Sequence, residues 1–275
     1  MKRVNFKQAE PTRRAGWLLG PVMVSYDPDE TGDEARLQAG ELATAAAVQV
    51  ESCAADGSTF GKTANLATAR DAGLVVLPGS MMAAAEGQYL LREAMATACP
   101  VLVARNRLEG PVMVVADTMR TGLGAMAVAA DEARRLDRPL LVVHAAEGNG
   151  NPKSDELRPV SAMSLRVCLD TIRLRWGVAV ETRSIEGPYV SSLPLLARAL
   201  AARLIVLRAY DGSGTENASR RQRMMEIASV APCSALLLPP PLEEREWLGE
   251  GPAPWVSPRP RFHSNVSTPA QGGVQ

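Results

Sequence analysis

The amino-acid sequence repeats itself, and this repetition limits the folds that the chain can adopt. The stretch GPVMVSYD at 20–27 returns as GPVMVVAD at 110–117, an offset of 90 residues. Further along, VQVESCA at 48–54 resembles LLVVHAA at 140–146, an offset of 92. A sequence that recurs in this way predicts two similar folding units in one chain.

The offset grows in the second part of the repeat. GSTFGKTANLATARDAGLVVL at 57–77 aligns with GPYVSSLPLLARALAARLIVL at 187–207, an offset of 130, and Cys99 aligns with Cys233 at an offset of 134. The earlier copy therefore lacks a segment that the later copy has. In the later copy this segment is roughly 155–184, which we predict to form one long helix and one strand.

We divide the chain accordingly into an N-terminal extension (1–19), a shortened unit (20–105, the first half), a complete unit (106–240, the second half) and a tail (241–275). Residues 104–109 are predicted to link the halves. The tail is rich in Pro, Gly and Ser without sustained periodicity, so we expect it to be mostly disordered.

Short β-branched and apolar runs alternate with helix-like segments in both halves. This order favours parallel strands joined by right-handed crossovers. The prediction is an α/β protein with two doubly wound, open parallel-sheet domains in tandem. Strands are expected at 21–26, 48–53, 74–77, 100–104, 112–116, 140–144, 178–184, 204–207 and 235–238; helices are expected at 31–46, 62–71, 86–97, 121–136, 159–176, 190–202 and 216–230.

Composition excludes several classes of function. Lys plus Arg and Asp plus Glu each number 30, so no basic excess points to a nucleic-acid surface. No apolar run is long enough to span a membrane, and the N-terminus lacks the apolar segment of a secretory signal. The four cysteines are far apart and form no metal-ligand spacing with the two histidines, so we expect reduced cysteines in a cytoplasmic protein without a metal site.

Four features together resemble the universal stress protein family: a first strand ending in Asp (VMVVAD117), a second strand ending LLVVHA at His144, a fourth strand LIVL leading into a loop and helix, and the ending ACPVLV at 98–103. The chain looks like a tandem member with a shortened first half. The resemblance implies that the halves pair through 100–104 and 234–238 as an internal pseudo-dimer, and it leaves a homodimer open. Such pairing would also cover an apolar edge strand.

Many members of that family bind ATP, and others do not. In those that do, the loop after the fourth strand carries Gly-x2-Gly-x9-Gly-Ser/Thr, whose backbone amides approach the phosphates. In the first half only Gly79 and Gly87 remain, eight residues apart, and Gln88 stands where Ser or Thr is expected. The glycine pair is missing, so this loop is predicted to be degenerate.

In the second half the loop holds Gly212 and Gly214, and Arg221 occupies the late-glycine position. This Gly-Ser-Gly is either a flexible turn before a helix or a divergent anion cradle. Asp211 would repel phosphate there, while neighbouring arginines would attract it.

Asp27 and Asp117 each follow a first strand. They either cap the next helix or contact a ligand, because ligands of open α/β sheets lie at the carboxyl ends of the strands. No catalytic residue set is visible. Two hypotheses follow: a non-enzymatic stress-response protein that acts through an unidentified protein partner, with nucleotide binding weak or lost and no cofactor, or an ATP-binding or ATP-hydrolysing protein of the related adenine nucleotide α-hydrolase-like group.

Overall fold

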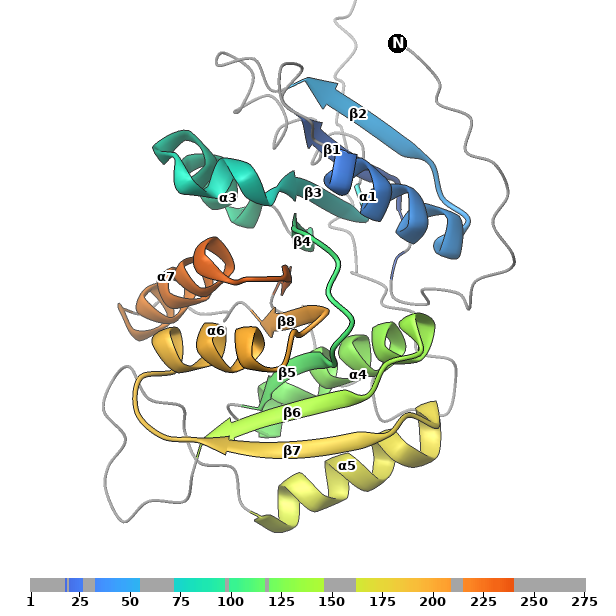
Figure 1. Cartoon of the computed structure of the whole chain (residues 1–275), viewed down its shortest axis with the longest axis vertical. Coiled ribbons are helices and arrows are strands. Elements are labelled where there is room, and N and C mark those ends of the chain that lie inside the picture. Colours follow the sequence, from blue (N-terminus) through green and yellow to red (C-terminus); the bar gives the residue numbers. More distant parts are fainter. Residues whose placement is uncertain are drawn as a thin grey trace, which may run out of the picture.

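The computed structural model describes residues 18, 20–26, 33–54, 72–96, 99–116, 119–145, 162–208 and 215–239. Its strands are β1 (Val22–Tyr26), β2 (Val50–Ala54), β3 (Leu74–Pro78), β4 (Val101–Ala104), β5 (Val112–Ala116), β6 (Leu140–Ala145), β7 (Val180–Ile185), β8 (Leu204–Arg208) and β9 (Ser234–Leu238). They form one nine-stranded sheet in the order β2-β1-β3-β4-β9-β8-β5-β6-β7, which Figure 1 shows from β2 at the top to β7 at the bottom.

The helices are α1 (Asp33–Ala46), the 3-10 helix η1 (Gly79–Ala83), α3 (Ala85–Ala96), α4 (Met119–Leu136), α5 (Ala162–Trp176), α6 (Tyr189–Ala199) and α7 (Thr215–Val230). Buried residues of α1, α4 and α5 share one hydrophobic core with one face of the sheet. Those of α3, α6 and α7 share a second core with the other face. The α/β class predicted from the alternating pattern is confirmed, and the sheet is covered on both faces.

The predicted strands are all present, with ends that shift by a few residues. The interiors of β3, β4 and β9 are fully buried, which explains why these strands appear in the sequence as continuous apolar runs instead of alternating ones. The edge strand β7 is largely exposed. The predicted helix at 62–71, the tail and all of the N-terminal extension except Leu18 lie outside the described residues.

Strands that the repeat makes equivalent also share their register. Val22 pairs with Leu74 in the first half, and Val112 pairs with Leu204 in the second, at the offsets of 90 and 130 residues. Val22 also pairs with Val50, and Val112 with Leu140. The offset between β2 and β6 is therefore 90 and not 92. The sequence alignment was wrong there because two apolar runs align almost equally well at either spacing.

The last strands of the two halves pair with each other. All neighbouring strands are parallel except β4 and β9, which are antiparallel, with Val101 opposite Leu237, Leu102 opposite Leu236 and Val103 opposite Ala235. Under the offset of 134, the first and third of these pairs exchange and the second maps onto itself. The expected contact between 100–104 and 234–238 is present. Outwards from this contact, the order β4-β3-β1-β2 on one side corresponds to β9-β8-β5-β6 on the other.

Helix α1 and helix α4 end in the same backbone motif. Ala47 and Asp137 have positive φ angles of 57° and 55°. After each, the next amide bonds back to a carbonyl five residues earlier, Val48 to Ala43 and Arg138 to Ala133. This is the Schellman ending, which favours glycine at the position that Ala47 and Asp137 occupy.

Candidate functional site at the junction of the two halves

The two described glycines of the predicted phosphate loop are held by close packing. A Cβ atom at Gly79 would lie 2.3 Å from the Arg105 Cγ atom and 2.7 Å from the Ala104 carbonyl oxygen. A Cβ atom at Gly87 would lie 1.9 Å from the Met81 carbonyl oxygen. Both positions therefore need glycine so that η1 can pack against the end of β4 and the start of α3.

This packing gives the first-half loop a compact form. The chain turns directly from β3 into η1, and the Ala84 amide closes that turn by donating to the Met81 carbonyl at 3.1 Å. At Gly79, the Arg105 side chain and the Ala104 carbonyl occupy the position that a Cβ would take. These atoms fill the space beside Gly79, so no room for a phosphate group remains on that side.

The other predicted site residues, Asp27, Asp117, Gly212 and Gly214, lie outside the described residues. The strands that precede them are described: β5 ends next to Asp117, and β8 ends at Arg208. Since β5 and β8 are neighbouring parallel strands, both carboxyl ends lie at the same edge of the sheet.

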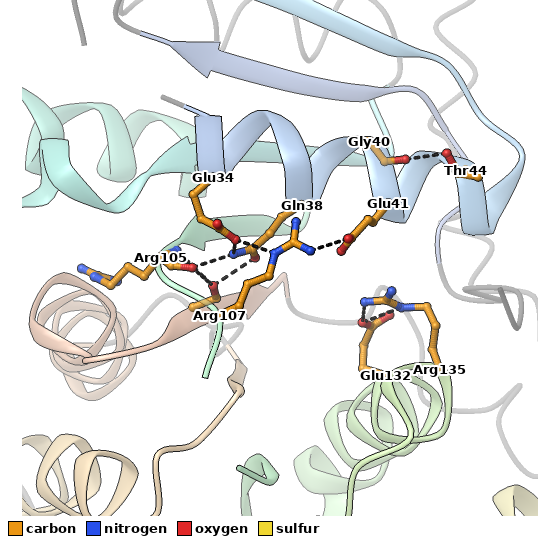
Figure 2. Close-up of polar contacts among 10 residues, drawn as sticks. Glu34, Gln38, Gly40, Glu41, Thr44, Arg105, Arg107, Glu132 and Arg135 are labelled. Carbon is orange, nitrogen blue, oxygen red and sulfur yellow. Dashed lines mark hydrogen bonds and ion pairs between the residues drawn. The ribbon is translucent and has the colours of Figure 1, made fainter. Parts of the chain in front are cut away.

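A polar cluster that the sequence did not reveal lies where the two halves meet, between α1, α4 and the β4–β9 pair (Figure 2). We call it the polar junction, and it consists of Glu34, Gln38, Glu41, Arg105, Arg107, Glu132, Arg135, Arg203 and Ser234. Its residues come from both halves and from the connector 105–111. Sequence reasoning missed it because its members are isolated polar residues in otherwise ordinary helices and strand ends.

At the centre of the junction, Gln38 joins α1 to the connector and to β9. Its amide nitrogen donates to the Arg105 carbonyl at 2.7 Å and to Glu34 Oε1 at 2.8 Å. Its side-chain oxygen accepts from the Ser234 hydroxyl at 3.0 Å, and the Arg105 amide in turn donates to Ser234 Oγ at 3.0 Å. Gln38 is 7% exposed and Ser234 is 3% exposed, so these bonds have little competition from water.

The side chain of Arg105 extends away from α1 to the other face of the sheet (Figure 2). There it donates to the Ser229 carbonyl at 2.8 Å, in the last turn of α7. A cation at a helix C-terminus is stabilised by the helix dipole. Burial lowers the pKa of Arg105, and its Nη1 atom is a buried donor without a hydrogen-bond partner.

The connector is held by ion pairs on both sides. Arg107 Nε bonds Glu34 Oε1 at 2.8 Å and its Nη1 atom pairs with Glu41, both on α1. Burial lowers the pKa of Arg107, but the hydrogen bonds and charges of Glu34 and Glu41 outweigh this effect and raise it. On the other side, Glu109 pairs with Arg138, just after α4. The segment predicted as a linker is therefore anchored to α1 in the first half and to the residues just after α4 in the second.

A small cavity of about 20 Å³ lies in the junction, which is room for about one water molecule. Arg135 and Glu132 line it and form a buried ion pair at 2.6 Å. Arg203 also lines it, and burial followed by the positive charge of Arg107 lowers its pKa. The cavity does not fit a nucleotide, so the junction holds the halves together and does not enclose a ligand of that size.

The described residues offer no reactive nucleophile at this site. Cys99, Cys168 and Cys233 are buried and free. Burial raises the pKa of Cys99 and of Cys233 to about 12, so neither thiol ionises near neutral pH and both are chemically inert there. Within the described ranges, no group of three His, Cys, Asp or Glu side chains is placed to hold a metal ion. No described helix is long and apolar enough to cross a membrane.

No family model matches the sequence, and no curated protein matches it. Solved structures do match the fold. A candidate universal stress protein from Pseudomonas aeruginosa UCBPP-PA14 superimposes with a TM-score of 0.57 and 17% identity, over 82% of this chain and 95% of that one. A protein of unknown function from Pseudomonas aeruginosa PAO1 gives 0.55 and 17%, over 82% and 94%.

A universal stress protein from Archaeoglobus fulgidus DSM 4304 gives a TM-score of 0.53 and 13% identity, over 82% of this chain and 90% of that one. The structural similarity therefore extends across most of each chain, although the sequence identity is low. At these identities the comparison concerns architecture and not ligands. The chain has the fold of the universal stress proteins.

Proposed function

We propose that this chain is a tandem universal stress protein, a non-enzymatic stress-response protein that binds a protein partner. The observation that carries the proposal is the antiparallel β4–β9 pair. Its residue pairs are symmetric about Leu102 and Leu236, so that equivalent residues of the two halves make equivalent contacts. That arrangement is expected of two stress-protein units fused into an internal pseudo-dimer. The polar junction and the anchored connector support it, because they hold the halves in one fixed orientation.

Weak or lost nucleotide binding in the first half is part of the proposal. The positions that a Cβ would take at Gly79 and Gly87 are filled by Arg105 and Met81, so a phosphate cannot approach these glycines from that side. The departures of the second-half loop from the family's glycine pattern extend this expectation to Gly212 and Gly214. We expect the protein to work in the cytoplasm without a resident cofactor.

Calorimetric titration of the full chain with ATP and with AMP tests this proposal. We expect no binding tighter than a Kd of about 1 mM, which corresponds to roughly −4 kcal/mol. Micromolar binding of either nucleotide would contradict the loss of the site. A thermal-shift series with the same nucleotides provides an independent readout, because a ligand that binds the folded state raises Tm.

The alternative function is ATP binding or hydrolysis in the second half. The observation in its favour is that β5 and β8 are neighbours, so the segments holding Asp117 and Gly212 begin at one edge of the sheet. ATP turnover that disappears in Asp117→Ala and persists in the surface control Asp170→Ala would support it. A folded sample without turnover or ATP binding would exclude it.

A further inference from the structure

Strand β7 forms the open edge of the sheet in the second half. It pairs with β6 and, among the described residues, with no other strand. Figure 1 shows it as the outermost strand, with α5 beside it. An open edge presents unpaired backbone amides and carbonyls that another strand can pair with.

The hydrogen-bonding pattern shows which backbone groups face outwards. The Leu140 amide on β6 donates to the Ala179 carbonyl at 2.8 Å, so Ala179 faces β6. Because successive residues of a strand alternate in direction, Glu181 and Arg183 also direct their backbone groups to β6. The backbone groups that point away from β6 therefore belong to Val180, Thr182 and Ser184.

The side chains of β7 carry a self-complementary charge pattern. Glu181 and Arg183 are both exposed, and they lie on one face of the strand with Thr182 between them on the other. Neither forms an ion pair within the described part of the chain. If a second copy of this strand runs antiparallel and is centred on the same residue, the acid of each strand lies opposite the base of the other.

We propose that two copies of this chain associate through β7, antiparallel about Thr182. In this arrangement Thr182 pairs with Thr182 of the second copy, and Val180 pairs with Ser184 of the second copy, through the backbone groups that point away from β6. Glu181 of each copy lies opposite Arg183 of the other, which gives two such pairs. Both pairs occupy non-hydrogen-bonded positions, where side chains are closest. A two-fold interface requires this kind of self-complementarity.

One contact competes with the association. The Arg173 guanidinium, from α5, donates to the outward Val180 carbonyl at 3.1 Å. That bond occupies one edge acceptor in the single copy, while no described residue outside β6 bonds the amide or the carbonyl of Thr182. The contact therefore weakens the association at the ends of the pairing and leaves its centre free.

Charge reversal at two positions tests the proposal by sedimentation velocity over a concentration series. Glu181→Arg alone, or Arg183→Glu alone, places like charges opposite each other twice, and we expect the dimer Kd to rise about tenfold or more. The double variant Glu181→Arg/Arg183→Glu restores opposite charges and should dimerise like the wild type. Mixing the two single variants should produce a heterodimer, since each supplies the charge that the other needs.

The control is Arg198→Glu on α6, an exposed reversal away from β7 that should leave association unchanged. Circular dichroism of each variant establishes that it is folded. A wild type that stays monomeric across the series overturns the proposal. A dimer that survives both single reversals overturns it as well, because its interface then lies elsewhere. This outcome is independent of the nucleotide titrations, so the two proposals fail separately.

Discussion

The Ser234 hydroxyl donates a 3.0 Å hydrogen bond to the side-chain oxygen of Gln38, across 196 residues of sequence. The bond joins the last strand of the second half to the first helix of the first half. It is buried, and the same hydroxyl accepts from the Arg105 amide. One hydroxyl thus ties together α1, the connector and β9.

Removing this hydroxyl should destabilise the whole protein. In Ser234→Ala, the Gln38 oxygen and the Arg105 amide lose a buried partner, and we expect the free energy of unfolding to fall by about 1–3 kcal/mol. Urea denaturation measures this loss. Ser191→Ala removes an exposed hydroxyl that also bonds a backbone carbonyl, and it should change stability by less than about 0.5 kcal/mol. Equal losses of unfolding free energy in the two variants would mean that the buried Ser234 bond stabilises the protein no more than an exposed one.

The two helical glycines Gly87 and Gly124 should respond to alanine in opposite directions. In Gly87→Ala the new Cβ would meet the Met81 carbonyl oxygen at 1.9 Å, so η1 or α3 must move, at a cost of about 1–3 kcal/mol. At Gly124, on α4, a Cβ meets nothing within 4 Å, and Gly124→Ala should stabilise by about 0.5–1 kcal/mol through helix propensity. Thermal unfolding distinguishes the two signs. A Gly87→Ala variant as stable as the wild type would contradict the close packing at Gly87. Phosphate binding by the loop at 79–87 would then no longer be excluded by packing.

The helix endings offer stabilising substitutions. Ala47 and Ala201 have positive φ angles of 57° and 46°, which a Cβ disfavours. Ala47→Gly and Ala201→Gly should each raise the free energy of unfolding by about 0.5–1 kcal/mol. The reverse change, Gly177→Ala at a φ of 64° in open space, should lower it by a similar amount. Tm values of the three variants, measured in parallel, test whether the φ angle alone decides if a substitution raises or lowers stability.

The buried thiols predict a loss of stability in alkali. Cys99 and Cys233 each have a pKa raised by burial from 9.0 to about 12. Between these values the unfolded thiol ionises and the folded one does not, so stability is complete below pH 9 and falls as pH rises towards 12. Each thiol should contribute a decrease of about 1 kcal/mol per pH unit in that window.

Urea denaturation at pH 8 and pH 10 measures this decrease. The double variant Cys99→Ala/Cys233→Ala serves as the comparison, because it keeps every other titrating group of the wild type. Its stability should fall less between the two pH values. Parallel curves for the two proteins would show that the thiols ionise as readily in the folded state as in the unfolded one.

The sequence by itself determined the elements and their class. Runs such as Val112–Ala116 are apolar and β-branched over the length of one strand, and their alternation with helices allows few arrangements other than a covered, mostly parallel sheet. The repeat added the equivalence of β1 with β5 and of β3 with β8, because residues of a similar pattern recur at a regular offset.

Only the tertiary structure decided how the halves meet and what the isolated polar residues do. Gln38, Arg105 and Ser234 have no local pattern, since each finds its partners through contacts between distant segments. The register of β2 could not be read from its apolar run, and the packing of Gly87 depends on where η1 places the Met81 carbonyl. Local sequence encodes periodicity and backbone preference, whereas buried polar pairing and close packing depend on three-dimensional neighbours that the folded chain alone brings together.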